Sequence, residues 1–365
     1  MPRAGMTGGH PAFPIPMSAA PLALSVLDLV PVRTGQTSAQ AVTASLATAD
    51  AADRLGYRRY WFAEHHNMPA VASTTPPVLV AAAAARTSRI RLGSGGVMLP
   101  NHSPLVVAEQ FAALEAIAPG RIDLGIGRAP GSDPVITQLL RQSGTTSDVD
   151  RFPDNIRDIL ALSSPEGASL RFTSGQEYAV RATPAATAAP EVWLLGSSDY
   201  SAQLAASMGL PYVFANHFSG DGLERALDLY RSQFRPASEG EIPRTFLTAN
   251  VVVADTDAEA RALALPQLRM MARLRGGRPL TALETVEQAY AAEAADRLAA
   301  PLESWAAQRW FIGTPDAVAE RLREFATRWQ VDEVMISPVA AAHDSDAMNA
   351  APSRLRTLEL LAPAA

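Results

Sequence analysis

Apolar, strand-like runs alternate with helical patterns along the chain from about residue 22, and this alternation limits the fold more than any other feature of the sequence. The eight strand-like runs begin at Leu22, Tyr60, Arg91, Arg121, Val192, Tyr212, Phe246 and Glu333. Between them, apolar residues recur at helical spacing, as in Val107, Phe111 and Leu114. The pattern predicts an α/β fold, a closed (β/α)8 TIM barrel, with an open doubly wound sheet as the alternative.

Two stretches are longer than an ordinary connection in such a barrel. Residues 128–150 are rich in Gly, Ser, Thr and Asp, which predicts a long lid or binding loop, or a disordered segment. Residues 255–313 continue a helical pattern, broken at Pro266, Gly276 and Gly277, which predicts a helical insertion before the last strand. We expect a single barrel domain over residues 22–365, preceded by a disordered tail at residues 1–21.

The chain contains no cysteine, and all 31 of its basic residues are arginine, so lysine is absent as well. Disulfides, thiolate nucleophiles, zinc–thiolate sites, Schiff-base lysines and the phosphate-loop lysine are therefore excluded. An anionic ligand would have to be held by arginine, by hydroxyl groups and by backbone amides at helix starts.

The charge distribution and the apolar stretches argue against nucleic acid and membrane partners. The formal net charge of −6 is spread along the chain without a basic run. The longest apolar stretches are alanine-rich and fall short of the roughly 20 residues of a membrane span. The first residues contain Pro and Gly where a signal peptide has its apolar core. We expect a cytoplasmic protein that binds neither nucleic acid nor membranes.

The second strand is followed directly by Glu64, His65 and His66, at the barrel end where parallel strands place their chemistry. One carboxylate and two imidazoles can transfer protons near neutral pH, although such residues also serve as structural hydrogen-bond partners. Adjacent residues of an extended strand point to opposite faces, so the two histidines are poorly placed to share a metal ion and no metal site is expected. His217, just past the sixth strand, is placed to face the same pocket.

Glycines end the third and fourth strands. Gly95 and Gly96 in the third allow either a close approach of backbone to a ligand or a β-bulge. The fourth strand ends in Gly125 and Gly127 and is followed by Arg128, which puts a permanent positive charge at the rim. Arg128 fits either an anionic ligand or a surface ion pair.

The fifth strand leads into Gly196, Ser197 and Ser198, and Ser201 follows in an alanine-rich helix. Free amides and hydroxyl groups at a helix start suit a phosphate group, while the alternative is that these residues only cap the helix. Arg128 lies at the neighbouring strand end, so closure of the barrel would bring it to the same place and favour the phosphate site.

Five segments together resemble the bacterial-luciferase-like flavin-dependent monooxygenases. They are YWFAEHHN from Tyr60, LGSGGVMLPNHSPLVVAEQFAALE from Leu92, PGRIDLGIGRAPGSDP from Pro119, LLGSSDYSAQLAASMGLP from Leu194 and FIGTPDAVAERL from Phe311. The resemblance covers nearly the whole chain. It implies a (β/α) barrel with reduced FMN across its mouth, where dioxygen gives a flavin C4a-peroxide that oxidises a small organic substrate.

The resemblance also assigns roles to individual residues. His65 matches the family's catalytic histidine, and Glu64 matches an acidic residue below the flavin. Gly95 and Gly96 match a pair joined by a cis peptide bond under the isoalloxazine ring, although the luciferase itself has alanine there. Arg128, Ser198 and Ser201 match groups that contact the flavin and its phosphate, and Arg151 resembles a second phosphate arginine. The implied flavin-binding residues are Glu64, Gly95, Gly96, Arg128, Arg151, Leu195, Gly196, Ser197, Ser198 and Ser201.

The sequence departs from the luciferase at two further places. Ser197 stands where the luciferase has glutamate, and its tryptophan after strand six falls near Asn216, so light emission is not expected. The resemblance implies a separate NAD(P)H-dependent flavin reductase as partner and a homodimeric state. Two alternatives remain open: hydride transfer with the deazaflavin coenzyme, and flavin binding without catalysis.

Overall fold

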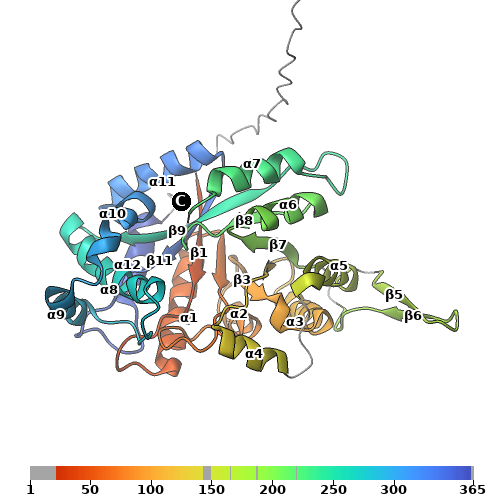
Figure 1. The fold of residues 1–365 in the computed structure, drawn as a ribbon, viewed down its shortest axis with the longest axis horizontal. Coiled ribbons are helices and arrows are strands. Elements are labelled where there is room, and N and C mark those ends of the chain that lie inside the picture. Colours follow the sequence, from red (N-terminus) through yellow and green to blue (C-terminus); the bar gives the residue numbers. More distant parts are fainter. Residues whose placement is uncertain (1–21, 143–148, 165, 186–187, 219, 363–365) are drawn as a thin grey trace, which may run out of the picture.

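The computed structural model describes residues 22–142, 149–164, 166–185, 188–218 and 220–362 (Figure 1). The expected tail at residues 1–21 lies outside the described residues. The strands are β1 (Ala23–Asp28), β2 (Arg59–Phe62), β3 (Arg91–Met98), β4 (Ile122–Gly127), β5 (Ala168–Arg171), β6 (Glu177–Val180), β7 (Glu191–Gly196), β8 (Tyr212–Phe214), β9 (Thr245–Val253), β10 (Phe311–Gly313) and β11 (Glu333–Pro338). The α-helices are α1 (Ser38–Arg54), α2 (Pro76–Ala84), α3 (Pro104–Ile117), α4 (Pro134–Gln142), α5 (Phe152–Leu162), α6 (Asp199–Met208), α7 (Leu223–Gln233), α8 (Asp257–Arg275), α9 (Val286–Asp296), α10 (Ala300–Arg309), α11 (Pro315–Trp329) and α12 (Pro352–Leu361).

Eight parallel strands close into a barrel. Hydrogen bonding follows the order β1, β2, β3, β4, β7, β8, β9 and β11, and β11 returns to β1 through the pair Ala23 and Glu333. These are the eight strands that the sequence predicts. The closed (β/α)8 barrel is therefore confirmed, and the open doubly wound sheet is wrong.

Helices cover the outside of the barrel with the apolar stripes that the sequence predicts. Val107, Phe111 and Leu114 of α3 are buried, and so are Val318 and Leu322 of α11. Figure 1 shows these helices around the strands, with α8, α9 and α10 grouped at one side. In the described part of the chain, no helix is long and apolar enough to cross a membrane.

The helical insertion before the last strand is present as α8, α9 and α10, but its details differ from the expectation. Pro266 does not interrupt it, because α8 continues from Asp257 to Arg275 and Pro266 lies buried inside it. A proline removes one helical hydrogen bond, and here the remaining turns and the buried face keep the helix continuous. Gly276 does end α8, and β10 then pairs with the far half of β9.

The stretch at residues 128–150 also differs from the expectation of a loop without secondary structure. Helix α4 occupies its middle and a short 3-10 helix (Val149–Arg151) its end, while residues 143–148 lie outside the described residues. A second difference follows α5, where the antiparallel pair β5–β6 forms a hairpin that the sequence pattern does not reveal.

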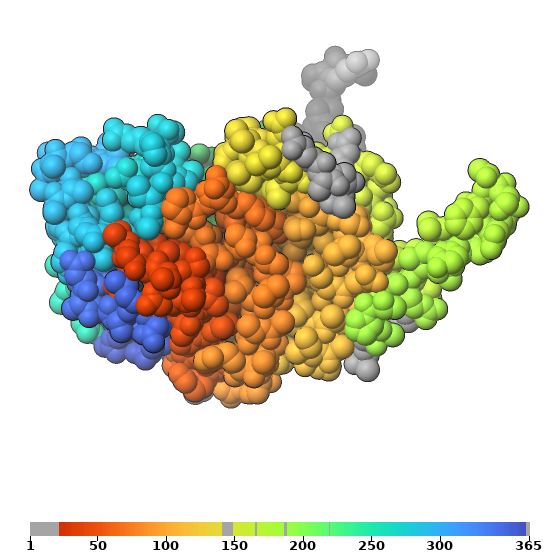
Figure 2. Space-filling view, turned by 90° about the horizontal axis from the view of Figure 1, so that it is seen from below, coloured from red at the N-terminus to blue at the C-terminus, as the bar shows by residue number. Residues whose placement is uncertain are grey.

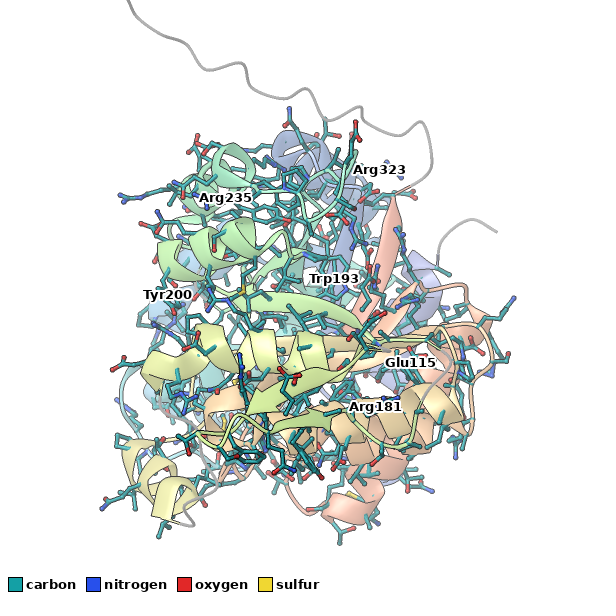
Figure 3. The ribbon with its side chains drawn as sticks, turned by 90° about the vertical axis from the view of Figure 1, so that its right-hand side faces the viewer. Glu115, Arg181, Trp193, Tyr200, Arg235 and Arg323 are labelled. Atoms are coloured by element: carbon teal, nitrogen blue, oxygen red, sulfur yellow. The ribbon has the colours of Figure 1, made fainter. Side chains whose placement is uncertain are left out.

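Large aromatic side chains fill the barrel interior. The ring centroids of Trp61 and Phe246 lie 5.3 Å apart, and those of Trp193 and Phe246 lie 4.8 Å apart. Figure 3 shows Trp193 among the strands. Strand β3 contributes little volume there: a Cβ atom on Gly95 would lie 2.5 Å from Leu27 Cδ1 and 3.3 Å from Trp61 Cβ. The glycines of β3 therefore make room for the indole ring of Trp61.

A buried arginine closes the end of the barrel where the strands begin. Arg59 Nη1 lies 2.8 Å from Asp123 Oδ2 and 3.1 Å from Glu191 Oε2, and its Nε lies 2.9 Å from Glu333 Oε1. The guanidinium also stacks 4.7 Å from the ring centroid of Trp193. One cation thus joins β2, β4, β7 and β11, which leaves the opposite end of the barrel for a site.

We predict that Arg59→Ala destabilises the protein by about 3–5 kcal/mol, because it removes the buried guanidinium that Asp123, Glu191 and Glu333 share and leaves them only their partners Arg91, Arg244 and Arg58 nearer the surface. The neighbouring Arg58 provides the control, since its side chain is 48% exposed and lies 3.4 Å from Glu333. Arg58→Ala should cost less than about 1 kcal/mol. Urea unfolding of both variants measures the difference. Equally small decreases in the free energy of unfolding would contradict the role given to Arg59.

Candidate active site

Glu64 is the central buried charge at the mouth of the barrel. Its Oε1 lies 2.9 Å from His66 Nε2 and 2.8 Å from His102 Nε2, and its Oε2 accepts the backbone N–H of Met98 at 3.0 Å. Burial by itself raises the pKa of Glu64, but these three partners outweigh it and lower the pKa to about 2. Glu64 is therefore an ionised group that ties the end of β2 to the end of β3 and to the segment after it.

His65 is not among the hydrogen-bond partners of the Glu64 carboxylate. Its backbone N–H donates to the carbonyl of Ser73 at 3.0 Å, while its Nδ1 atom is buried and has no hydrogen-bond partner within the described chain. Burial lowers the pKa of the His65 imidazole, although the charge of Glu64 acts in the opposite direction. A neutral imidazole with one unsatisfied nitrogen is therefore held at the mouth of the barrel.

His217 faces the same space from the other side of the mouth, after β8. Its Nδ1 lies 2.6 Å from Oγ1 of Thr248, a β9 residue, and its carbonyl accepts from Asn250 Nδ2 at 2.9 Å. Burial lowers the pKa of His217 to about 4, and a positive charge on His65, whenever it is protonated, acts in the same direction. The sequence-based placement of His217 at the pocket agrees with this geometry, and the site contains two imidazoles that are neutral at pH 7.

The lowered pKa of His217 predicts a pH-dependent stability. The unfolded chain takes up a proton on this histidine near pH 6.5, the folded chain only near pH 4, so stability falls as pH drops through that window. When the pH is lowered from 7 to 5, the free energy of unfolding of His217→Gln should therefore fall by about 2 kcal/mol less than that of the parent protein. Urea unfolding at both pH values measures this difference. The control is His343→Gln, which changes a histidine paired with Glu287 at 2.7 Å. An unchanged pH dependence in His217→Gln would contradict the account.

The glycines of β3 and β4 shape the floor of the site. The Gly95–Gly96 peptide bond is cis, as the resemblance implies, and the pairing of β3 with β4 shifts register between Ser94 and Val97. The predicted bulge is thus present as well. A Cβ atom on Gly96 would lie 2.7 Å from the carbonyl oxygen of Gly125, so the two backbones meet without side chains between them.

Arg128 meets the start of α6, as closure of the barrel requires. Its guanidinium carbon lies 4.1 Å from the ring centroid of Tyr200, in the first turn of α6, and Figure 3 shows Tyr200 at that end of the helix. The side chain of Ser198, the N-cap residue, makes no capping hydrogen bond. The carboxylate of Asp199 forms an ion pair with Arg225, at 2.8 Å. The helix start thus has backbone amides without a side-chain cap, and Arg128 lies beside them, which is the arrangement that anions prefer.

The remaining predicted ligands occupy different positions around this helix start. Ser197 is exposed, and Leu195 lies partly buried above the aromatic interior. Ser201 is buried, its hydroxyl donates to the carbonyl of Ser198 at 2.8 Å, and a Cβ atom on Gly196 would lie 2.3 Å from that hydroxyl oxygen. Arg151 lies exposed at the start of α5. Their roles toward a flavin stay predictions.

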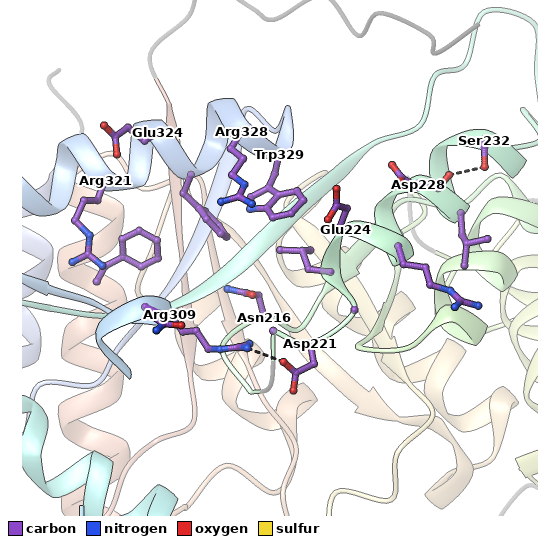
Figure 4. A pocket seen from close by; sticks show the side chains of 18 residues that line it. Asn216, Asp221, Glu224, Asp228, Ser232, Arg309, Arg321, Glu324, Arg328 and Trp329 are labelled. Atoms are coloured by element: carbon purple, nitrogen blue, oxygen red, sulfur yellow. Dashed lines mark hydrogen bonds and ion pairs between the residues drawn. The ribbon is translucent and has the colours of Figure 1, made fainter. Parts of the chain in front are cut away.

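No group of three or more potential metal ligands occurs among the described residues. A groove of about 1080 Å³ opens between α7 and α11 (Figure 4). Arg309 and Asp221 pair across it at 2.7 Å, and both charge signs line its walls. None of the predicted catalytic or flavin-binding residues is among the 18 that line it, although Asn216, next to His217 of the mouth, is.

Comparison with known proteins identifies the family. The family model described as luciferase-like monooxygenase matches residues 23–333. The chain belongs to the luciferase-like monooxygenase family. A protein of Escherichia coli K12 named luciferase-like monooxygenase is 39% identical over 320 residues, which cover 87% of this chain and 91% of that protein.

Two further relatives of this luciferase-like monooxygenase are informative. The N-acetyl-S-alkylcysteine monooxygenase of Bacillus subtilis 168 is 33% identical over 324 residues, covering 87% of this chain and 93% of that one. The crystal structure of apo-MsnO8 has a TM-score of 0.80 and 35% identity, and the match covers 94% of this chain and 97% of that chain.

Three residues of the luciferase-like monooxygenase site escape the sequence argument. His102 contacts Glu64 from beyond β3, and Thr248 orients His217, but neither lies next to a strand end that the sequence singles out. Thr248 could have been found from the alternation of inward and outward residues along β9. Tyr200 carries no such signal, because an aromatic residue in the first turn of a helix is unremarkable on its own.

Proposed function

We propose that this luciferase-like monooxygenase uses reduced FMN and dioxygen to oxidise a small organic substrate, through a flavin C4a-peroxide. One observation carries the proposal: a buried imidazole nitrogen without a partner, on His65, shares the barrel mouth with an anion-binding helix start beside Arg128. A flavin mononucleotide has a polar ring system at one end and a phosphate at the other, and this arrangement suits both ends.

The phosphate end would be held at the start of α6. The guanidinium of Arg128, the backbone amides of the first turn and the exposed hydroxyls of Ser197 and Ser198 are the donors that a phosphate needs. Since the chain lacks lysine, arginine is the permanently charged side chain for this purpose.

The ring end would lie over the glycine floor of β3 and β4, near His65. Bound FMN supplies the redox chemistry, and the chain supplies orientation, exclusion of water and control of protons. The aromatic interior below, with Trp61 and Trp193, is closed to solvent. Because burial favours its neutral form, the His65 imidazole would accept a proton from a reacting group and, once protonated, return it to a reacting oxygen, while ionised Glu64 holds the surrounding segments in place.

The reduction of FMN is assigned to a separate NAD(P)H-dependent reductase, which makes the enzyme the oxygenating component of a cytoplasmic two-component system. The sequence supports this division, because Gly125 and Gly127 are not followed by the third glycine of a dinucleotide fingerprint. Hydride transfer with the deazaflavin coenzyme is the second reading of the same barrel.

A homodimer is the proposed assembly. Exposed apolar side chains lie on the outer faces of two neighbouring helices, at Val78 of α2 and at Leu105, Val106 and Ile117 of α3. The commonest assembly that would cover apolar side chains on neighbouring helices is a second copy across a two-fold axis.

Replacement of Arg128 by alanine tests the phosphate site. Loss of the guanidinium should weaken FMN binding by about 10- to 100-fold, the effect of one charge-assisted hydrogen bond, and leave riboflavin binding unchanged. Titration with both flavins separates the phosphate from the ring. Arg157→Ala is the control, since Arg157 is exposed and pairs with Asp154 at 2.6 Å. Equal weakening of both flavins would remove Arg128 from the phosphate site, and tighter binding of the deazaflavin coenzyme than of FMN would favour the second reading.

Replacement of His65 by alanine tests catalysis apart from binding. We expect kcat to fall by about 100-fold or more while FMN affinity stays within a few-fold, because a proton-transferring group affects the reaction rather than the ground state. N-Acetyl-S-alkylcysteines are the first substrates to assay, given the name of the Bacillus relative. Unchanged turnover in His65→Ala would refute the role of this histidine.

A further inference from the structure

Part of the barrel mouth is lined by polar side chains without a permanent charge. This polar sector comprises Asn216 and His217 after β8, Thr248 and Asn250 of β9, and Ser337 of β11. Thr248 and Asn250 follow Phe246 of the aromatic interior at intervals of two residues, so they lie on the inward face of β9. Ser337 follows Met335 of the interior in the same way, and the strand register pairs it with Asn250. None of the flavin-binding residues proposed above belongs to this sector.

The polar sector shares its opening with His65. Helix α4 follows β4 and the helical insertion follows β9, so both mark the end of the barrel at which the strands finish. Figure 2 shows α4 in yellow and the insertion in cyan along the same edge of the molecule. Within this opening, a positive charge on His65 would lower the pKa of His217, so the two rings lie within electrostatic reach of one another.

Residues of β9 hold His217 in one position. The backbone N–H of His217 donates to Thr248 Oγ1 at 3.2 Å, and its carbonyl accepts from Asn250 Nδ2 at 2.9 Å. The preceding residue, Asn216, donates from Nδ2 to the carbonyl of Thr248 at 3.2 Å. The ring itself is fixed through Nδ1, which lies 2.6 Å from Thr248 Oγ1. The other ring nitrogen, Nε2, is therefore held on the side away from Thr248.

The hydroxyl of Thr248 determines which ring nitrogen of His217 carries the proton. A hydroxyl donates one hydrogen bond and accepts two. Its oxygen lies 3.3 Å from the carbonyl oxygen of Phe214, which can only accept, so the hydroxyl proton is donated there. The two lone pairs then accept the backbone N–H of His217 and the proton on Nδ1. All three contacts are hydrogen bonds only in this tautomer, which leaves Nε2 of the neutral ring as an acceptor.

Two polar atoms of the sector have no partner within the described chain: Nε2 of His217 and the hydroxyl of Ser337. Neither belongs to the fully enclosed unpartnered atoms, of which His65 Nδ1 is one, so both can be reached by a ligand. Asn250 links their positions, since its side chain contacts His217 and its backbone pairs with that of Ser337. The sector thus offers one hydrogen-bond acceptor and one hydroxyl donor.

We propose that the polar sector binds a secondary amide of the substrate, with His217 Nε2 accepting the amide N–H and the Ser337 hydroxyl donating to the amide carbonyl. A secondary amide is a small uncharged group that supplies one donor and one acceptor together. A carboxylate or an ammonium group would be enclosed here without an opposite charge, and an alkyl chain would leave both polar atoms unpaired. The amide site rests on the proposed function, because the amide belongs to the substrate that the flavin would oxidise.

Two probes that differ by a single N–H group test the amide site. N-acetyl-S-methylcysteamine has a secondary amide, and methylthioethyl acetate is the ester with oxygen in place of the N–H. Both contain the thioether that the name of the Bacillus relative suggests. NMR titration gives the dissociation constant of each probe, with oxidised FMN so that no turnover occurs and again without flavin. The parent protein should bind the amide at least about tenfold more tightly, because the ester leaves Nε2 without a donor.

Three variants locate the preference for the amide. His217→Phe keeps a ring but removes its nitrogens, so the two probes should bind with affinities within about twofold of each other. Thr248→Val removes the hydroxyl that fixes the tautomer and should reduce the preference to below about threefold. Thr245→Val is the matched control, the same substitution at the start of the same strand, where Oγ1 is buried without a hydrogen-bond partner in the described chain. Its preference for the amide should equal that of the parent protein.

Proton–nitrogen NMR correlation spectra of the imidazole rings report the tautomer directly, and the His217 signal is identified by its loss in His217→Phe. A proton on Nε2, equal affinities of the parent protein for the two probes, or an unchanged preference in His217→Phe would overturn the amide site. A parent protein that binds neither probe would overturn it as well. FMN titration of the same samples tests the proposed function separately: a preference for the amide without FMN binding would contradict the flavin chemistry and leave the amide site standing.

Discussion

The packing of Trp61 inside the barrel is the constraint on which the rest of the site depends. The indole ring occupies the centre together with Trp193 and Phe246, and β3 can pass beside it only because its positions facing the ring are glycines, Gly93 and Gly95. Position 93 must be glycine for the same reason, since a Cβ atom on Gly93 would lie 2.7 Å from Trp61 Nε1. The glycines that resemble a flavin-supporting motif are therefore also required by the core. One set of residues fixes the interior and gives the mouth a floor of bare backbone.

Charge is divided between the two ends of the barrel. At the bottom, Arg59 contacts three carboxylates, whose charge Arg58, Arg91 and Arg244 help to balance. At the mouth, Glu64 is bound by His66, His102 and the backbone N–H of Met98, and Asp28 is held by Arg354 at 2.6 Å. His65 is left with an unsatisfied nitrogen. The shared arginine thus lies at the strand-start end, and of the buried polar atoms without a partner in the described chain His65 Nδ1 lies at the strand-end mouth, where barrels bind their ligands.

Much of the fold could be predicted because buried parallel strands are nearly continuous apolar runs, which stand out in a sequence. All eight barrel strands were found in this way. The β5–β6 hairpin was not, because its exposed strands mix apolar and polar residues over only four positions each. Helix α4 was missed for a related reason: Gly, Ser and Asp flank it, so composition indicated a loop. Of the site, His65 and Arg128 follow from strand ends. His102, Thr248 and Tyr200 depend on contacts between segments far apart in the chain, which no local pattern records.

The central claim is that the barrel mouth binds reduced FMN and controls its reaction with dioxygen. The most direct measurement mixes the protein anaerobically with reduced FMN, admits oxygen and follows the absorbance of the flavin. The account predicts that a flavin C4a-peroxide accumulates and outlives by far the reoxidation of free flavin, because the site excludes water and His65 controls the proton. Reoxidation as fast as that of FMN free in solution would contradict it.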